Sequence, residues 1–194
     1  MKLKKLYLLL PLAIILYACP YESGVPLVTH PTEPVDTSLM GYWYGIVKDG
    51  SDFFGIEALE ISKQSDSVYS IIRYGKAIKG DIILPDTAYF TGYTSTIGDQ
   101  RFMNVEGSVV ITTNQGKKAP VVKVEKVYYL SALDKSHDTL SVRTITEKFS
   151  PARKVFNTAD LLNTEVTEQL RLHHNIYDDL YSLSYRKIPK PKSF

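Results

Sequence analysis

The histidine-containing groups in this sequence are a weak basis for catalysis or metal binding. His173 and His174 are adjacent in a predicted helix, so their side chains point about 100° apart and do not readily share a metal ion. Ser136-His137-Asp138 contains the residue types of a catalytic triad. Three consecutive residues cannot form a nucleophile–base–orienter relay, so we interpret this group as a hairpin turn.

Carboxylates and short motifs do not indicate an enzyme either. Glu57 and Glu60 lie three apart in a predicted strand, and residues at that spacing face opposite sides of the strand. There is no Gly-rich phosphate loop, no HExxH motif and no cysteine nucleophile. We therefore expect no catalytic residue, no metal site and no cofactor. A weak hydrolase or isomerase with an unrecognised site is the alternative.

Tyrosine is unusually frequent, with 14 in the chain. A tyrosine ring has a flat apolar face and a polar tip, which suits a cavity for amphiphiles or an interface. We single out four tyrosines on predicted strands as possible ligand-binding residues: Tyr44, Tyr69, Tyr89 and Tyr128. The high β propensity of tyrosine explains their number equally well.

The N-terminus predicts export. Residues 1–18 have a cationic start, the apolar run Leu6–Leu16 and a small residue before Cys19, which are the parts of a secretory signal peptide. The run spans only about 16 Å as a helix, too short to cross a bilayer.

Leu16-Tyr17-Ala18-Cys19 resembles the lipobox of bacterial lipoproteins, and Tyr17 is its one bulky departure. The resemblance implies that Cys19 becomes the lipidated first residue and that the membrane is a partner through it. The following Pro-Tyr-Glu-Ser-Gly lacks an acidic export signal, so we expect the periplasmic face of the outer membrane in a bacterial cell envelope. An ordinary cleaved signal with a leftover thiol is the alternative.

The proline-rich stretch after Cys19 predicts a tether. Pro20–Ser38 contains four prolines among polar residues, which favours extended polyproline conformation with a reach of at most about 60 Å. We therefore assign residues 19–38 to the lipidated cysteine and tether, residues 39–188 to one domain, and residues 189–194 to a flexible tail.

Composition supports one globular domain and gives no reason to expect nucleic-acid binding. The chain has 194 residues, of which 44% are hydrophobic and 23% charged, so it can bury a core. Without the lysines of the signal peptide, 20 basic residues face 21 acidic ones. A near-neutral surface has no electrostatic preference for polyanions.

From Met40 onward, β-branched and aromatic runs alternate with turn residues, which predicts an antiparallel barrel or sandwich. A helix over Asn157–Tyr181, with an apolar stripe that packs on the sheet, and a short strand over Ser182–Ile188 follow. The eight strands predicted before the helix are Tyr42–Lys48, Phe54–Lys63, Val68–Tyr74, Ala77–Leu84, Thr87–Tyr93, Phe102–Thr112, Val121–Leu130 and Thr139–Thr146.

Gly41-Tyr42-Trp43, with the only tryptophan of the chain, resembles the Gly-x-Trp signature of the lipocalin barrel. The resemblance implies a mainly β fold: an eight-stranded antiparallel barrel with one C-terminal helix and a short final strand. It also implies that Trp43 plugs the closed end and that an arginine from a late strand stacks on it. Arg186 is preferred over Arg143 because it follows the helix. A β-sandwich whose core Trp43 fills is the alternative.

These features together predict a lipid-anchored, non-catalytic envelope protein. We expect its barrel to bind a small apolar or amphiphilic ligand. The alternative is an accessory or scaffold subunit of an outer-membrane protein complex.

Overall fold

The computed structural model describes residues 21–49, 53–79, 82–113, 121–151 and 155–190. The predicted signal peptide, Cys19 and the last four residues of the predicted tail lie outside the described residues. No helix in the described ranges is both long and apolar enough to cross a membrane.

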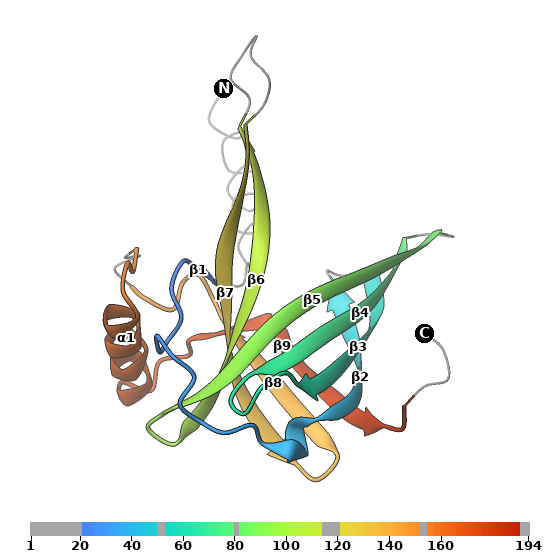
Figure 1. Cartoon of the computed structure of the whole chain (residues 1–194), viewed down its shortest axis with the longest axis horizontal. Coiled ribbons are helices and arrows are strands. Elements are labelled where there is room, and N and C mark those ends of the chain that lie inside the picture. The colour runs from blue at the N-terminus through green and yellow to red at the C-terminus, as the bar shows by residue number, and fades with distance from the viewer. Residues whose placement is uncertain (1–20, 50–52, 80–81, 114–120, 152–154, 191–194) are drawn as a thin grey trace, which may run out of the picture.

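Eight antiparallel strands close into a ring (Figure 1). Strand β9 closes it by pairing with β2 on one edge and β8 on the other. This ring confirms the predicted barrel, and the sandwich alternative is wrong. The ring strands are β2 (Gly41–Asp49), β3 (Phe53–Lys63), β4 (Tyr69–Lys79), β5 (Ile82–Ile97), β6 (Gln100–Thr113), β7 (Val121–Ser136), β8 (Thr139–Ile145) and β9 (Tyr177–Ile188).

The number of strands before the helix differs from the prediction. The segment predicted to form three strands over residues 68–93 forms parts of only two long strands, β4 and β5. Gly75 and Pro85, expected to break strands, lie inside them in adjacent register positions. Pro85 is tolerated because β5 pairs with β6 only as far as Thr91, so its proline lies in an edge segment. Seven strands of the ring therefore precede the helix. The final strand has 12 residues and is a full member of the ring.

The segment expected to be a free tether packs against the barrel. We call residues 21–39 the N-terminal strap; it includes β1 (Glu22–Ser23), which pairs with β7, and the short 3-10 helix η2 (Thr37–Leu39). Leu27 and Leu39 are buried, and the Leu27 N–H donates to Asn104 Oδ1 at 2.7 Å. Proline keeps the strap extended, and burial of its leucines holds it on the wall.

The helix α1 (Ala159–Arg171) is shorter than predicted. Thr158 caps its start by accepting from the Leu161 N–H at 3.3 Å. The chain turns at His173, whose φ is 56°, and Tyr177 already belongs to β9. The predicted packing of its apolar stripe on the outside of the sheet is confirmed.

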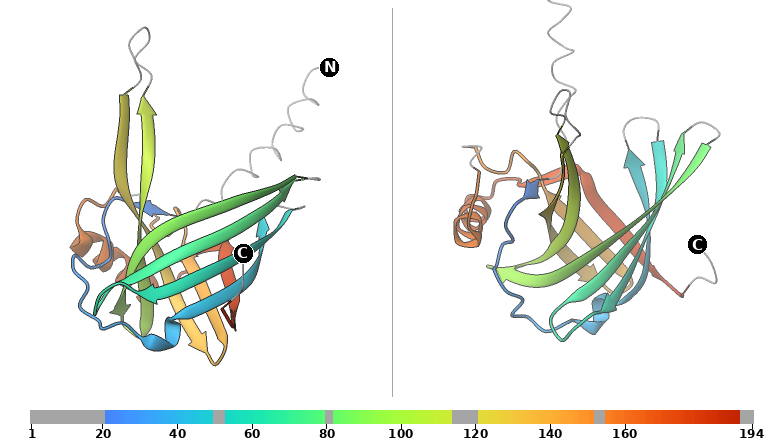
Figure 2. Two further views of the ribbon diagram at one scale, coloured as in Figure 1. Left: turned by 45° about the vertical axis from the view of Figure 1, so that its right-hand side comes forward. Right: turned by 45° about the horizontal axis from the view of Figure 1, so that its top comes forward.

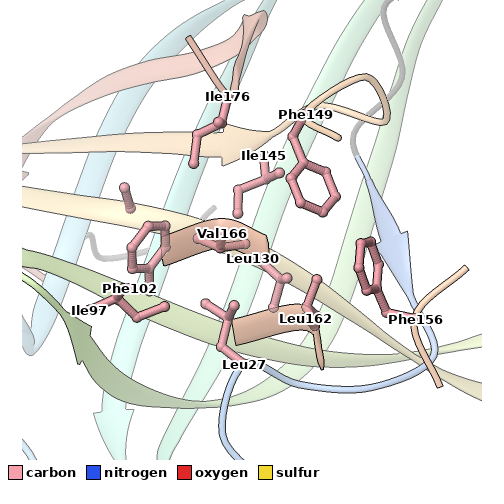
Figure 3. Close-up of a cluster of buried hydrophobic side chains, with 11 residues drawn as sticks. Leu27, Ile97, Phe102, Leu130, Ile145, Phe149, Phe156, Leu162, Val166 and Ile176 are labelled. Carbon is pink, nitrogen blue, oxygen red and sulfur yellow. The ribbon is translucent and has the colours of Figure 1, made fainter. Parts of the chain in front are cut away.

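The buried residues form two clusters, one on each face of the barrel wall. The outer cluster joins α1 and the strap to the wall through Leu27, Phe102, Leu130, Ile145, Leu162 and Val166, among others (Figure 3). The inner cluster fills one end of the barrel with Leu39, Trp43, Ile61, Tyr69, Ile71, Met103, Leu140 and Tyr185. The barrel therefore has one plugged end.

Candidate functional site

Trp43 lies at the centre of the plugged end and is fully buried. Its Nε1–H donates to the Leu39 carbonyl at 2.8 Å. Gly41 enters the strand at φ 121°, a conformation that favours glycine. The Gly-x-Trp pattern thus performs the structural task that its resemblance implies.

The cation over Trp43 is Lys187, and the expectation for Arg186 is wrong. Lys187 Nζ lies 5.1 Å from the centroid of the indole ring, within the range of a cation–π contact. Arg186 is exposed, and its backbone pairs with Tyr44 and Thr139. Arg143 lies 4.3 Å from the ring centroid of Tyr177.

Two glycines allow close packing of side chains in the plug. A Cβ on Gly45 would lie 2.8 Å from a ring carbon of Tyr185. A Cβ on Gly92 would lie 2.9 Å from Ile71 Cδ1 and 3.0 Å from Met103 Sδ. The side chains of Tyr185, Ile71 and Met103, on the strands next to these glycines, therefore fill the space that a Cβ would need.

Above the plug, a polar group lies inside the barrel. The Tyr185 hydroxyl donates to Glu57, and Arg73 Nη1 lies 3.9 Å from Glu57 Oε2. Burial, and then the nearby Glu57 carboxylate, raise the pKa of Tyr185. Because the opposite charges of Glu57 and Arg73 lie close together, this group adds no net charge to the interior of the barrel.

The glutamates predicted on opposite sides of β3 have separate environments. Glu57 contacts Tyr185 of the inner cluster, whereas Glu60 accepts hydrogen bonds from Tyr42 at 2.8 Å and Tyr74 at 2.9 Å. The two carboxylates are thus not an acid–base pair.

The other end of the barrel is open at its side, between β5 and β6. Their pairing stops at Thr91 and Glu106, while the β4–β5 and β6–β7 hairpins continue and diverge (Figure 2). A depression of about 590 Å³ lies at this point. We call it the β5–β6 gap; it is lined by Ser70, Ala88, Tyr89, Phe90, Thr91, Glu106, Gly107, Ser108 and Tyr129.

An aromatic pair lies in the gap. The rings of Phe90 and Tyr129 meet edge to face, with centroids 6.4 Å apart. Gly107 allows this approach, because a Cβ there would lie 3.2 Å from the Phe90 ring. The Tyr129 hydroxyl donates to Glu22 at 3.0 Å; burial, then that carboxylate, raise the pKa of Tyr129 to about 12.

The rim of the gap is polar and its charges are paired. Glu106 accepts from the Tyr128 hydroxyl at 3.1 Å, and Lys126 Nζ lies 2.7 Å from the same carboxylate. An apolar surface beside a hydrogen-bonding rim matches an amphiphile better than a compact ion.

The four tyrosines singled out from the sequence do not share one site. Tyr89 lines the gap, and Tyr128 lies on its rim. Tyr69 is buried in the plug, where its hydroxyl accepts from the Asp36 N–H at 2.6 Å. Tyr44 is exposed on β2, and its neighbours in the sheet are Ala58 and Arg186.

Sequence reasoning missed Phe90 and Tyr129. They are 39 positions apart in the chain. Phe90 directly follows Tyr89, and Tyr129 directly follows Tyr128. Only the point at which the β5–β6 pairing ends decides that both residues line the β5–β6 gap. The alternation of Leu183 and Tyr185 did contain the signal for Lys187, because period two places residue 187 on their face.

The hairpin turn predicted at His137 is confirmed, but the prediction that His173 and His174 lie in a helix is wrong, because α1 ends at Arg171. His137 lies in the β7–β8 hairpin turn with φ 51°. His174 Nδ1 lies 2.7 Å from Gln169 Oε1. Within the described ranges, no three His, Cys, Asp or Glu side chains are grouped to hold a metal ion.

The fold and the gap together define a closed antiparallel barrel with one plugged end and a lateral opening near the other. Comparison of the chain with protein-family models, with curated proteins and with solved structures gave no match.

Proposed function

We propose that this protein is a lipid-anchored, non-catalytic protein of the bacterial cell envelope that binds a small apolar or amphiphilic ligand in the β5–β6 gap. The observation that carries the proposal is the Phe90–Tyr129 pair in a depression of about 590 Å³. The buried side chains of the inner cluster fill the other end of the barrel. The lipocalin resemblance of Gly41 and Trp43, with the lipobox resemblance at Cys19, supports the class and the location.

The chemistry of the gap favours a ligand with an apolar body and a polar end. The faces of Phe90 and Tyr89 would contact the apolar part, and Glu106 with Ser108 would accept or donate hydrogen bonds at the rim. Because Lys126 already neutralises Glu106, a strongly charged head group is not required.

A fluorescence titration with the amphiphilic probe N-phenyl-1-naphthylamine tests the site. Removal of the Phe90 ring in Phe90→Ala should raise the Kd at least about fivefold, since an aromatic contact is worth about 1 kcal/mol or more. Tyr89→Ala removes an exposed ring of the same gap and should act in the same direction. Tyr44→Ala, which removes an exposed tyrosine on β2, is the matched control.

Equal affinity in Phe90→Ala, Tyr89→Ala and Tyr44→Ala would show that the probe does not bind in the gap and would overturn this site. Native mass spectrometry of protein extracted from cell envelopes gives an independent readout. A bound lipid-sized mass is expected in the wild type and is lost in Phe90→Ala.

The scaffold-subunit alternative also has an observation in its favour. Ile46 on β2 and Ile56 on β3 are exposed and directly opposite each other on the wall, and Tyr44 is exposed beside them. An exposed apolar cross-strand pair is a common feature of interaction surfaces. A photo-crosslinker at position 46 that captures one stoichiometric envelope protein would favour this function over ligand binding.

A further inference from the structure

Strands β6 and β7 continue past the ring as a two-stranded ribbon (Figures 1 and 2). The last β5 partner of β6 is at Glu106, and the last β1 partner of β7 is at Tyr128. Residues 107–113 and 121–127 therefore pair only with each other. At about 3.3 Å per residue, this ribbon extends about 20 Å from the rim of the barrel.

One face of the ribbon carries three exposed valines, which we call the valine face: Val110, Val122 and Val124. Their exposed fractions are 66%, 61% and 65%, and Val110 lies directly opposite Val124. Thr112 lies opposite Val122 on this face, and the exposed Ile111 lies opposite Lys123 on the other face. Lys123, one residue along, lies on the other face with Glu125, and the two form an ion pair at 2.5 Å. Exposed strand edges usually carry charges toward solvent, so an apolar face on a projecting ribbon indicates a contact.

The start of the described chain lies beside the base of this ribbon. The Tyr21 N–H donates to the Ile145 carbonyl at 2.8 Å, and Glu22 pairs with Tyr129 of β7. Cys19 is two residues before Tyr21 in the sequence, and a connection of that length spans at most about 7 Å. Because the strap packs on the barrel, a short connection joins the barrel to the proposed lipid anchor, in place of the extended tether predicted from the sequence.

We infer that the valine face lies in the interface of the lipid bilayer, next to the acyl chains on Cys19, and that the barrel rests against the membrane with its ribbon. This inference rests on the lipidation in the proposed function. The ribbon contacts the interface and does not span the membrane, because both edges of a two-stranded ribbon have backbone groups that hydrocarbon cannot satisfy.

The short connection to Cys19 indicates that the partner of the valine face is the bilayer. With Cys19 anchored, the connection from the bilayer to Tyr21 spans at most about 7 Å, so a ribbon about 20 Å long is within reach of the same surface. The Lys123–Glu125 pair on the other face remains in water or among head groups.

The test uses the full-length lipoprotein, purified from cells and reconstituted in phosphatidylcholine vesicles with brominated acyl chains. Lipidation blocks Cys19, so Val122→Cys provides one thiol for a bimane label. Lys123→Cys, on the neighbouring residue of the opposite face, is the matched control. We expect bromine to quench the label at position 122 at least twofold more than the label at position 123.

Val124→Cys repeats the measurement on the same face if Val122→Cys does not fold. Labels at 122 and 124 that are quenched no more than the label at 123, in protein whose N-terminal mass includes the acyl chains, overturn the ribbon inference and leave the anchoring intact. An N-terminal mass without acyl chains overturns the anchoring itself. A blue shift without bromine quenching indicates that a protein, including a second copy, covers the valine face, and it also overturns the inference.

Discussion

Leu27→Ala tests whether the N-terminal strap is a structural part of the barrel. Leu27 is 1% exposed and packs in the outer cluster with residues of the wall and α1. Truncation of a buried leucine to alanine removes its transfer free energy and leaves a cavity, which costs about 2–5 kcal/mol. If the strap were a free tether, the same change would alter the free energy of unfolding by less than about 0.5 kcal/mol.

Urea unfolding, followed by circular dichroism and by the fluorescence of Trp43, measures the difference. With an m value of about 2 kcal/mol/M, a loss of about 3 kcal/mol lowers the midpoint by about 1.5 M. Trp43 belongs to the inner cluster, so a shift in both signals shows that the strap and the barrel unfold together.

Thr29→Ala is the matched control, since Thr29 is an exposed residue of the same strap. Its midpoint should match that of the wild type. If Leu27→Ala and Thr29→Ala unfold at the same urea concentration, the strap does not contribute to stability and the docked arrangement is refuted.

Two further predictions concern the plug and the strap. Gly45→Ala places a Cβ 2.8 Å from the buried Tyr185 ring and should lower the free energy of unfolding, measured by thermal unfolding, by about 1–3 kcal/mol. Gly24→Ala is the control: there is open space around Gly24, so the substitution should not lower the midpoint of thermal unfolding. Although partial burial opposes the charge of Asp36, hydrogen bonds from Ser38 and Arg101 lower its pKa to about 2. Because the unfolded pKa is about 3.9, the stabilisation is complete above pH 4 and is lost as the pH falls toward 2. Urea midpoints at pH 5 and pH 2.5 should therefore differ less in Asp36→Asn than in the wild type; an equal difference would contradict this contribution.

The sequence by itself determined the features that depend on local pattern. β-Branched and aromatic runs between turn residues predicted the strands, and the four-residue spacing of Leu162, Val166 and Leu170 predicted a helix that packs on a sheet. The resemblance of Gly41-Tyr42-Trp43 to the lipocalin signature implied the plug at Trp43. The spacing of Glu57 and Glu60 was enough to separate their side chains onto two faces of one strand.

Only the tertiary structure decided what depends on which strands are neighbours. Gly75 and Pro85 appear as breaks in sequence, but the missing neighbour of β5 at that point lets one strand continue through Pro85. The strap has the composition of a linker, yet the wall supplies an apolar surface for Leu27 and a buried acceptor on Asn104. Phe90 and Tyr129 line the β5–β6 gap together because the β5–β6 pairing ends before the two hairpins do. Such long-range pairing is set by the packing of the whole barrel, and no window of adjacent residues contains it.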